Sequence, residues 1–269
     1  MGALLALASA LAYGIADYAG GVLSRRAHFG TVAFVGQVGG LVFALAAAPF
    51  VPAHVNLAGL AWGALSGVGT GVGMLFLYRG ISRGAMSVVV PVSAVGGVAI
   101  PVVVGVALLG DRPTALAWAG IVTAVPALWL VARTRGPAKA DGVTDALFAS
   151  VGIAVQYLAL AQAGDTGGAG LWAIVAGRVA AALVVLPAVR RPVTAVVPAA
   201  ACGAIAALAL TCYLLATWQQ LLTVAVVLSS LYPVIPVLLG ITLLRERLTR
   251  TQVAGLAGAA AATGLLVVG

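Results

Sequence analysis

Leu108-Leu109-Gly110-Asp111-Arg112-Pro113-Thr114 recurs 135 positions later as Leu243-Leu244-Arg245-Glu246-Arg247-Leu248-Thr249. The match extends over residues 78–132 and 213–267, where it also aligns Tyr78 with Tyr213 and Pro101 with Pro236. Both copies lie in almost unbroken apolar sequence. A duplicated membrane unit is a common ground plan of secondary transporters, so this repeat narrows fold and function more than any single residue does.

The composition is that of a membrane protein. Apolar residues make up 63% of the 269 residues and charged residues 7%, whereas soluble domains are about half apolar and about a quarter charged. The apolar runs lack the alternation of a membrane barrel, so we expect an all-α membrane protein. The net charge is +8, and all but one of the 14 cations lie in or beside short connections, which favours orientation in a bilayer over nucleic-acid binding.

No sequence motif points to catalysis or to a cofactor. His28 and His54 lie in connections, and no HExxH motif, GxSxG motif or nucleotide-binding P-loop occurs. Cys202 and Cys212 stand ten residues apart without zinc or haem spacing, so we expect them to be buried apolar residues. The sequence therefore predicts neither an enzyme nor an ATP-driven pump, and no metal or cofactor.

Ten stretches are long and apolar enough to cross a bilayer as helices of about 20 residues. They lie at residues 3–23, 31–50, 58–77, 85–109, 115–132, 146–164, 170–188, 196–217, 221–244 and 251–268. A charged linker at residues 135–145 separates a first five-helix repeat, residues 1–134, from a second, residues 146–269.

The cations predict how the chain crosses the membrane. Twelve of the 14 Lys and Arg residues fall in loops of one side, and only Arg112 lies on the opposite side. Positive loops stay in the cytoplasm, which places both termini outside. Because each repeat has an odd number of helices, the second copy must enter the membrane upside down. We therefore expect two inverted repeats around a central cavity.

Two charged residues fall well inside predicted spans, Asp17 and Arg178. Each costs about 2.5–3.5 kcal/mol at a helix centre, so such residues are functional candidates by default. Three interpretations stay open. Asp17 could bind and release a proton or a cationic substrate, because burial favours the neutral carboxyl. Asp17 could instead form a structural ion pair with Arg178, or Arg178 alone could bind an anionic group.

Further polar residues accompany these two charges. Tyr13 shares a helix face with Asp17, and Gln37 occupies in its span the place that Arg178 occupies in the seventh. The remaining candidates for substrate contact or interhelical hydrogen bonds are Gln156, Tyr157, Tyr78 and Tyr213, with Trp218, Gln219 and Gln220 as weaker ones. Gln156 and Tyr157 lie near the position in the second half that matches Asp17.

Helix breakers and glycines indicate where the helices bend and pack. Prolines fall in the fourth span, at Pro91 and Pro101, and in the ninth, at Pro233 and Pro236. A proline removes a backbone donor and can kink a helix, freeing carbonyls to face a cavity or a neighbour. The GxxxG spacings 36/40, 67/71 and 69/73 predict close packing between helices.

The chain resembles a bacterial EamA-type member of the drug/metabolite transporter superfamily. The resemblance rests on two repeats of five spans and on an acidic residue after the fourth span of each, Asp111 and Glu246. The first span, with Asp17, is also similar to that of the small multidrug resistance proteins, in which a membrane carboxylate couples protons to export. The second half has no carboxylate matching Asp17.

The resemblance implies a multi-pass carrier of the inner (plasma) membrane that exports or exchanges a small organic metabolite or drug. Its partners would be the substrate, the lipid bilayer and, through Asp17, protons. An uncoupled facilitator with an Asp17–Arg178 ion pair is the alternative mechanism, and a non-transporting membrane subunit is a third. The sequence leaves open whether the protein is a monomer or a homodimer.

Overall fold

The computed structural model describes residues 2–104, 114–132, 137–165, 168–190, 195–219 and 231–268. These residues form α-helices, two short 3₁₀ helices and connections, with no strand among them. The helices are α1 (Gly2–Ser24), α2 (Phe29–Ala47), η1 (Ala48–Phe50), α3 (Leu57–Arg83), α4 (Met86–Val104), α5 (Ala115–Ala132), α6 (Pro137–Asp165), α7 (Leu171–Val185), η3 (Leu186–Ala188), α8 (Val196–Gln219), α10 (Val234–Thr242) and α11 (Arg250–Val268). The predicted all-helical class is confirmed.

Six segments of the described chain are long and apolar enough to cross a membrane. They are Gly2–Ser24, Phe29–Phe50, Leu57–Arg83, Gly142–Ala163, Leu171–Ala188 and Val196–Ala216. Met86–Pro101 and Trp118–Ala127 are shorter apolar helical stretches. The protein is therefore a multi-pass membrane protein. The count of ten spans stays a prediction, because residues 105–109 and 221–230 of two predicted spans lie outside the described residues.

Helix ends differ from the predicted spans where charged residues extend a helix beyond its apolar part. The predicted span 115–132 coincides with α5. In contrast, α3 runs to Arg83 and not to residue 77, so Arg79 and Arg83 lie on its last turns and not in a loop. Helix α6 begins at Pro137, within the segment expected to be a linker. Helical hydrogen bonding continues past the apolar stretch, because arginine heads can remain in water while their stems stay on the helix.

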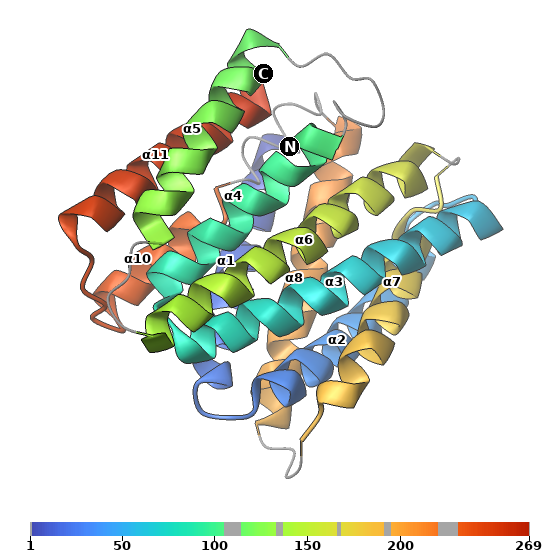
Figure 1. The fold of residues 1–269 in the computed structure, drawn as a ribbon. Coiled ribbons are helices and arrows are strands. Elements are labelled where there is room, and N and C mark those ends of the chain that lie inside the picture. Colours follow the sequence, from blue (N-terminus) through green and yellow to red (C-terminus); the bar gives the residue numbers. More distant parts are fainter. Residues whose placement is uncertain are drawn as a thin grey trace.

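Helices of the first half pack mainly on helices of the second half. Helix α3 lies against α6 and α7, and α8 lies against α1 and α2. Figure 1 shows α6, α3 and α7 side by side, with α5 and α11 paired at one edge of the molecule. The largest buried apolar cluster includes Val32, Ile81, Met86 and Val185, so the core lies between the halves.

Glycines let α3 approach two helices at once. A Cβ on Gly67 would overlap the backbone of Gly177 in α7, and one on Gly69 would lie 2.6 Å from the carbonyl oxygen of Gly152 in α6. In α2, the carbonyl of Gly36 lies against Gly203 of α8. Backbones this close exclude any side chain at the contact, which confirms the packing role predicted from the GxxxG spacings.

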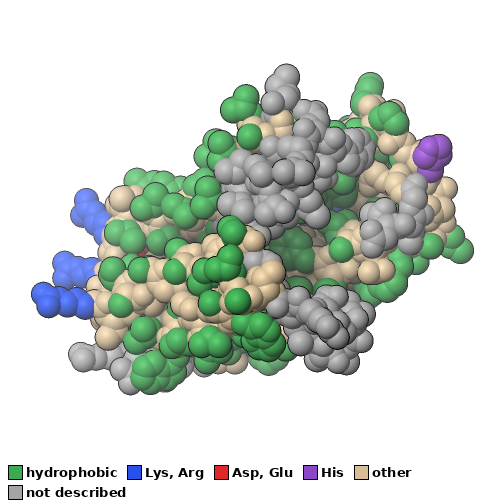
Figure 2. All heavy atoms as spheres, turned by 90° about the horizontal axis from the view of Figure 1, so that it is seen from above, with side chains coloured by type: hydrophobic (Ala, Val, Ile, Leu, Met, Phe, Trp, Pro, Cys, Tyr) green, Lys and Arg blue, Asp and Glu red, His purple; other side chains and the backbone are tan. Residues whose placement is uncertain are grey.

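Charged side chains gather at one end of the bundle. On the face shown in Figure 2, the visible Lys and Arg side chains lie at one end and the visible histidine lies at the other. The cation-rich end, as we call it, contains the last turns of α1 and α3 and the segment 243–249 between α10 and α11. This distribution agrees with the prediction that most cations lie in loops on one side of the membrane.

Candidate functional site

A polar cavity of about 60 Å³ lies between the two halves of the chain. It is lined by side chains of α1, α3, α6, α7 and α8 and of the turn before α10: Tyr13, Asp17, Thr70, Gly73, Met74, Leu77, Ile153, Gln156, Tyr157, Arg178, Ala206 and Tyr232. Both of the charged residues predicted inside spans therefore face one cavity. Five of the eight predicted substrate or coupling residues lie here.

Arg178 is held by a residue of the opposite half. Its Nη1 donates a hydrogen bond of 2.9 Å to Oε1 of Gln37, and both side chains are buried. A Cβ on Gly40 would lie 3.2 Å from Nε of Arg178, so the glycine leaves room for the arginine side chain. Gln37 is thus a partner of Arg178 behind the cavity wall and does not itself line the cavity.

Asp17 is 5% exposed and faces the cavity without an ion pair. Among the described residues, no cation lies within 4.0 Å of its carboxyl group and no side chain or amide donates to it. In this conformation Arg178 contacts Gln37 and not Asp17. A buried carboxyl without a protein donor needs a proton, water or a ligand.

The tyrosines divide between the cavity and its surroundings. The Tyr13 and Tyr232 rings lie 6.0 Å apart at the cavity wall. Tyr78 is buried with its hydroxyl against Gly20, and Tyr213 packs in an apolar cluster with Leu210, so neither lines the cavity. The side chains of Trp218, Gln219 and Gln220 lie outside the described residues.

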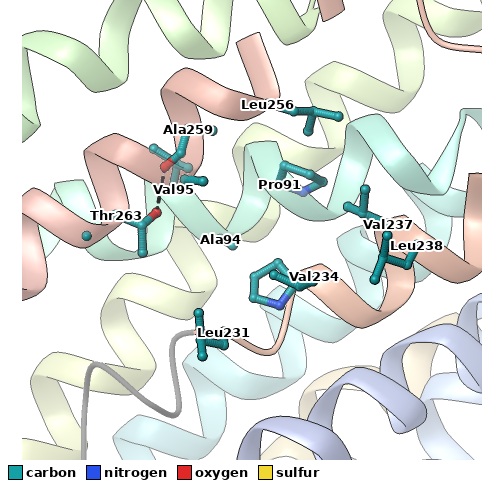
Figure 3. Close-up of a pocket in the computed structure, with 13 residues that line it drawn as sticks. Pro91, Ala94, Val95, Leu231, Val234, Val237, Leu238, Leu256, Ala259 and Thr263 are labelled. Carbon is teal, nitrogen blue, oxygen red and sulfur yellow. Dashed lines mark hydrogen bonds between the residues drawn. The ribbon is translucent and has the colours of Figure 1, made fainter. Parts of the chain in front are cut away.

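Two of the four predicted helix breaks, Pro91 and Pro233, line a second, apolar pocket. Helix α4 continues through Pro91 and Pro101, while Pro233 precedes α10 and Pro236 is buried within it. Pro91 and Pro233 line a pocket of about 240 Å³ between α4, α10 and α11 (Figure 3). Its one hydroxyl, that of Thr263, already donates to the carbonyl of Ala259 at 2.9 Å. With no free donor among these residues to orient a polar ligand, this pocket is a weaker candidate than the smaller polar cavity.

Seven residues that line the cavity are not among the predicted site residues: Thr70, Gly73, Met74, Leu77, Ile153, Ala206 and Tyr232. Thr70 stands between Gly69 and Gly71 of α3, in a run whose glycine spacing predicts helix packing. Its side chain nevertheless lines the cavity. Tyr232 precedes Pro233, and that position beside a helix break was the available signal. Met74 had no signal, because an apolar residue at this position reads as a core residue.

Comparison with known protein families finds a match for the first half of the chain. Residues 1–133 match the EamA-like transporter family. No curated protein matches the chain significantly.

Proposed function

Since residues 1–133 make this chain a member of the EamA-like transporter family, we propose that it is a secondary active transporter that exports or exchanges a small organic metabolite or drug. The polar cavity is the proposed binding site, and transport proceeds by alternating access between two inverted repeats, residues 1–134 and 146–269. The proposed location is the cell (plasma) membrane, with both termini outside.

Helix packing supports a two-fold relation between the repeats, and their proposed inversion follows from the odd number of helices in each. Exchange of α1 with α6, α2 with α7, α3 with α8, α4 with α10 and α5 with α11 turns the main contacts between the halves into one another. The packing of α3 on α6 becomes that of α8 on α1, α3 on α7 becomes α8 on α2, and α4 on α6 becomes α10 on α1. The pairs α2–α7, α4–α10 and α5–α11 exchange with themselves. A two-fold relation between the halves produces this pattern.

Individual residues follow the same exchange. The contact between Gly36 of α2 and Gly203 of α8 corresponds to the contact between Gly177 of α7 and Gly67 of α3. Gln37 and Arg178, which occupy matching places in the two halves, form a hydrogen bond with each other. Equivalent residues of two symmetric units touch each other only near the symmetry axis. This hydrogen bond therefore marks the proposed axis, beside the cavity.

The observation that carries the proposal is the meeting of Asp17 and Arg178 at one cavity between the halves. Pockets for organic ligands usually measure about 300–1,000 Å³, whereas one water needs only about 10–15 Å³. A cavity of about 60 Å³ holds a few waters but no organic solute. We therefore propose that the cavity widens to admit its substrate.

We assign proton coupling to Asp17. Its carboxyl group faces the cavity, lacks a partner among the described residues, and lies in α1 away from bulk water. A carboxyl in such a place can take up a proton on one side of the membrane and release it on the other as the cavity changes access. Arg178, held by Gln37, supplies a fixed positive charge for an anionic part of the substrate.

Reconstitution into liposomes tests the proposal. We expect a panel of labelled metabolites and drugs to include at least one that the wild-type protein moves and that empty liposomes do not. Asp17→Asn should abolish accumulation driven by a pH gradient, and Asp17→Glu should retain part of it. Transport of no compound would remove the transporter proposal. Unchanged pH-driven transport by Asp17→Asn would remove the coupling role and leave an uncoupled facilitator.

A further inference from the structure

The carboxylate of Glu246, in the segment 243–249 of the second half, binds the start of α4 in the first half. Its Oε1 accepts from the backbone amide of Met86 at 2.9 Å. Its Oε2 accepts from the amide of Ser87 at 2.9 Å and from the Ser87 hydroxyl at 2.6 Å. These amides belong to the first turn of α4, which has no helical acceptor for them and attracts negative charge.

Arg25 at the end of α1 completes the contact. Its Nη2 donates to Oε1 of Glu246 at 2.7 Å and to the carbonyl of Gly84 at 3.0 Å, and its Nε donates to the carbonyl of Ile81 at 3.0 Å. Arg25 therefore connects the last turn of α3 to the same carboxylate. We call this set of contacts, from Glu246 to Arg25, Met86 and Ser87, the Glu246 latch.

The latch is partly withdrawn from water, since the Glu246 side chain is 10% exposed. Burial alone would raise the pKa of Glu246, but the hydrogen bonds from Ser87, Arg25 and Met86 outweigh it and hold the pKa below the ordinary value of 4.5. The carboxylate is thus charged at neutral pH, and its hydrogen bonds are of the stronger, charge-assisted kind.

Two other polar contacts at the cation-rich end also join the halves. Arg79 and Arg83 of α3 each lie 3.5 Å from a carboxylate oxygen of Asp145 in α6. The Thr31 hydroxyl at the start of α2 donates to the Arg190 carbonyl at 2.9 Å and accepts from the Arg190 amide at 3.0 Å. All three contacts cross between the halves at that end.

The Asp145 and Glu246 contacts differ in how readily they can be released. Asp145 lies on α6, whose backbone at Gly152 packs directly against glycines of α3. We therefore expect α3 and α6 to move together, which keeps the Asp145 contact in place. Glu246 lies in a connecting segment beside α10. Once this end opens, water can replace every partner of the latch, including the two amides of α4. Release of the latch therefore leaves no buried donor or acceptor without a hydrogen bond. The contact can consequently break and reform reversibly.

We propose that the Glu246 latch is the gate of the cation-rich end: the cavity opens to that side only when the carboxylate leaves the first turn of α4. This inference rests on the alternating access of the proposed function. It adds to that function the contact that must break, and it assigns Glu246 a role in the access change and none in substrate binding.

Cysteine labelling tests the gate without any knowledge of the substrate. The starting protein carries Met74→Cys in the cavity wall, with Cys202 and Cys212 replaced by Ala. A membrane-impermeant thiol reagent is added to one side of the vesicles, and a parallel protein with Arg26→Cys identifies the cation-rich side. In this background, Glu246→Gln should raise the labelling rate from that side about tenfold, equivalent to about 1.4 kcal/mol in the opening equilibrium. The matched control Arg247→Gln, in the same segment but without a latch contact, should leave the rate unchanged.

A second variant guards against loss of the fold. Ser87→Ala keeps the carboxylate and removes only the 2.6 Å hydrogen bond, so it should raise the rate in the same direction by a smaller factor. Equal labelling rates in Glu246→Gln, Ser87→Ala and the starting protein would overturn the gate. Labelling requires no transport, so a protein that gates but moves no compound separates this inference from the proposed function.

Discussion

At the scale of single residues, the hydrogen bond between Gln37 and Arg178 joins the halves beside the cavity. Gln37→Leu removes the acceptor and leaves a buried guanidinium without its partner. A hydrogen bond to a charged group contributes roughly 1.5–3 kcal/mol, so we expect the variant to unfold at a lower temperature by that order of free energy. Gln37→Glu offers Arg178 a carboxylate and should be more stable than Gln37→Leu. Thermal unfolding of the two purified variants checks this, and equal midpoints would contradict it.

Glu246 predicts a pH dependence of stability. Its folded-state pKa lies below the ordinary value of 4.5, so its stabilising contribution is present above about pH 4.5 and is lost as the pH falls through the folded-state value. The melting temperature of the wild type should exceed that of Glu246→Gln at pH 7, and the gap should narrow below pH 4.5. Melting curves of both proteins across this range measure the gap. A gap that widened in acid would reverse the assigned sign.

At the scale of helices, the glycine faces of α3 fix how closely α6 and α7 approach. Gly67→Ala places a methyl group on the backbone of Gly177, and overpacking of this kind costs about 1–3 kcal/mol. Gly264→Ala in α11 is the matched control, because nothing lies within 4 Å of the added carbon. It should be neutral or slightly stabilising, since alanine favours a helix by about 0.5–1 kcal/mol over glycine. Thermal unfolding of both variants in detergent checks the contrast.

The positions of the helices could be predicted from the sequence more accurately than the residues at which they end. Apolar runs located α1, α2, α5, α7, α8 and α11 to within a few residues, because insertion in a bilayer depends on the same apolar length. The C-terminal end of α3 and the start of α6 were misplaced. Arg79 and Arg83 lie beside Asp145 of α6, and a contact between distant segments leaves no mark in local composition.

At the scale of the whole molecule, the cation distribution predicts its orientation. We expect a cysteine at Arg26 to be labelled from the cytoplasm and a cysteine at His54, in the connection between α2 and α3, to be labelled from outside. An impermeant thiol reagent applied to intact cells and to inside-out vesicles distinguishes the two sides. Labelling of both cysteines from the same side would contradict the predicted topology.

The candidate site could be predicted in part. Asp17 and Arg178 stood out because charge inside an apolar span is rare, and the structure brings both to one cavity. Whether Asp17 and Arg178 contact each other could not be predicted from the sequence, because two opposite buried charges are compatible with an ion pair. In the structure, the helix packing places Gln37 against Arg178 instead. Thr70 and Met74 resemble packing residues in sequence, and only the arrangement of α3 between its neighbours turns them toward the cavity.

The bond between Gln37 and Arg178 also bears on how a duplicated chain can diverge. In the proposed inverted arrangement these two positions are copies of one position, and they touch. Two arginines here would set like charges at hydrogen-bonding distance in a buried place, and two glutamines would leave the cavity without its cation. Two identical halves would therefore carry either two arginines or none at this place. Fusion of the halves into one chain lets the copies differ, and one copy can keep the arginine while the other supplies its acceptor.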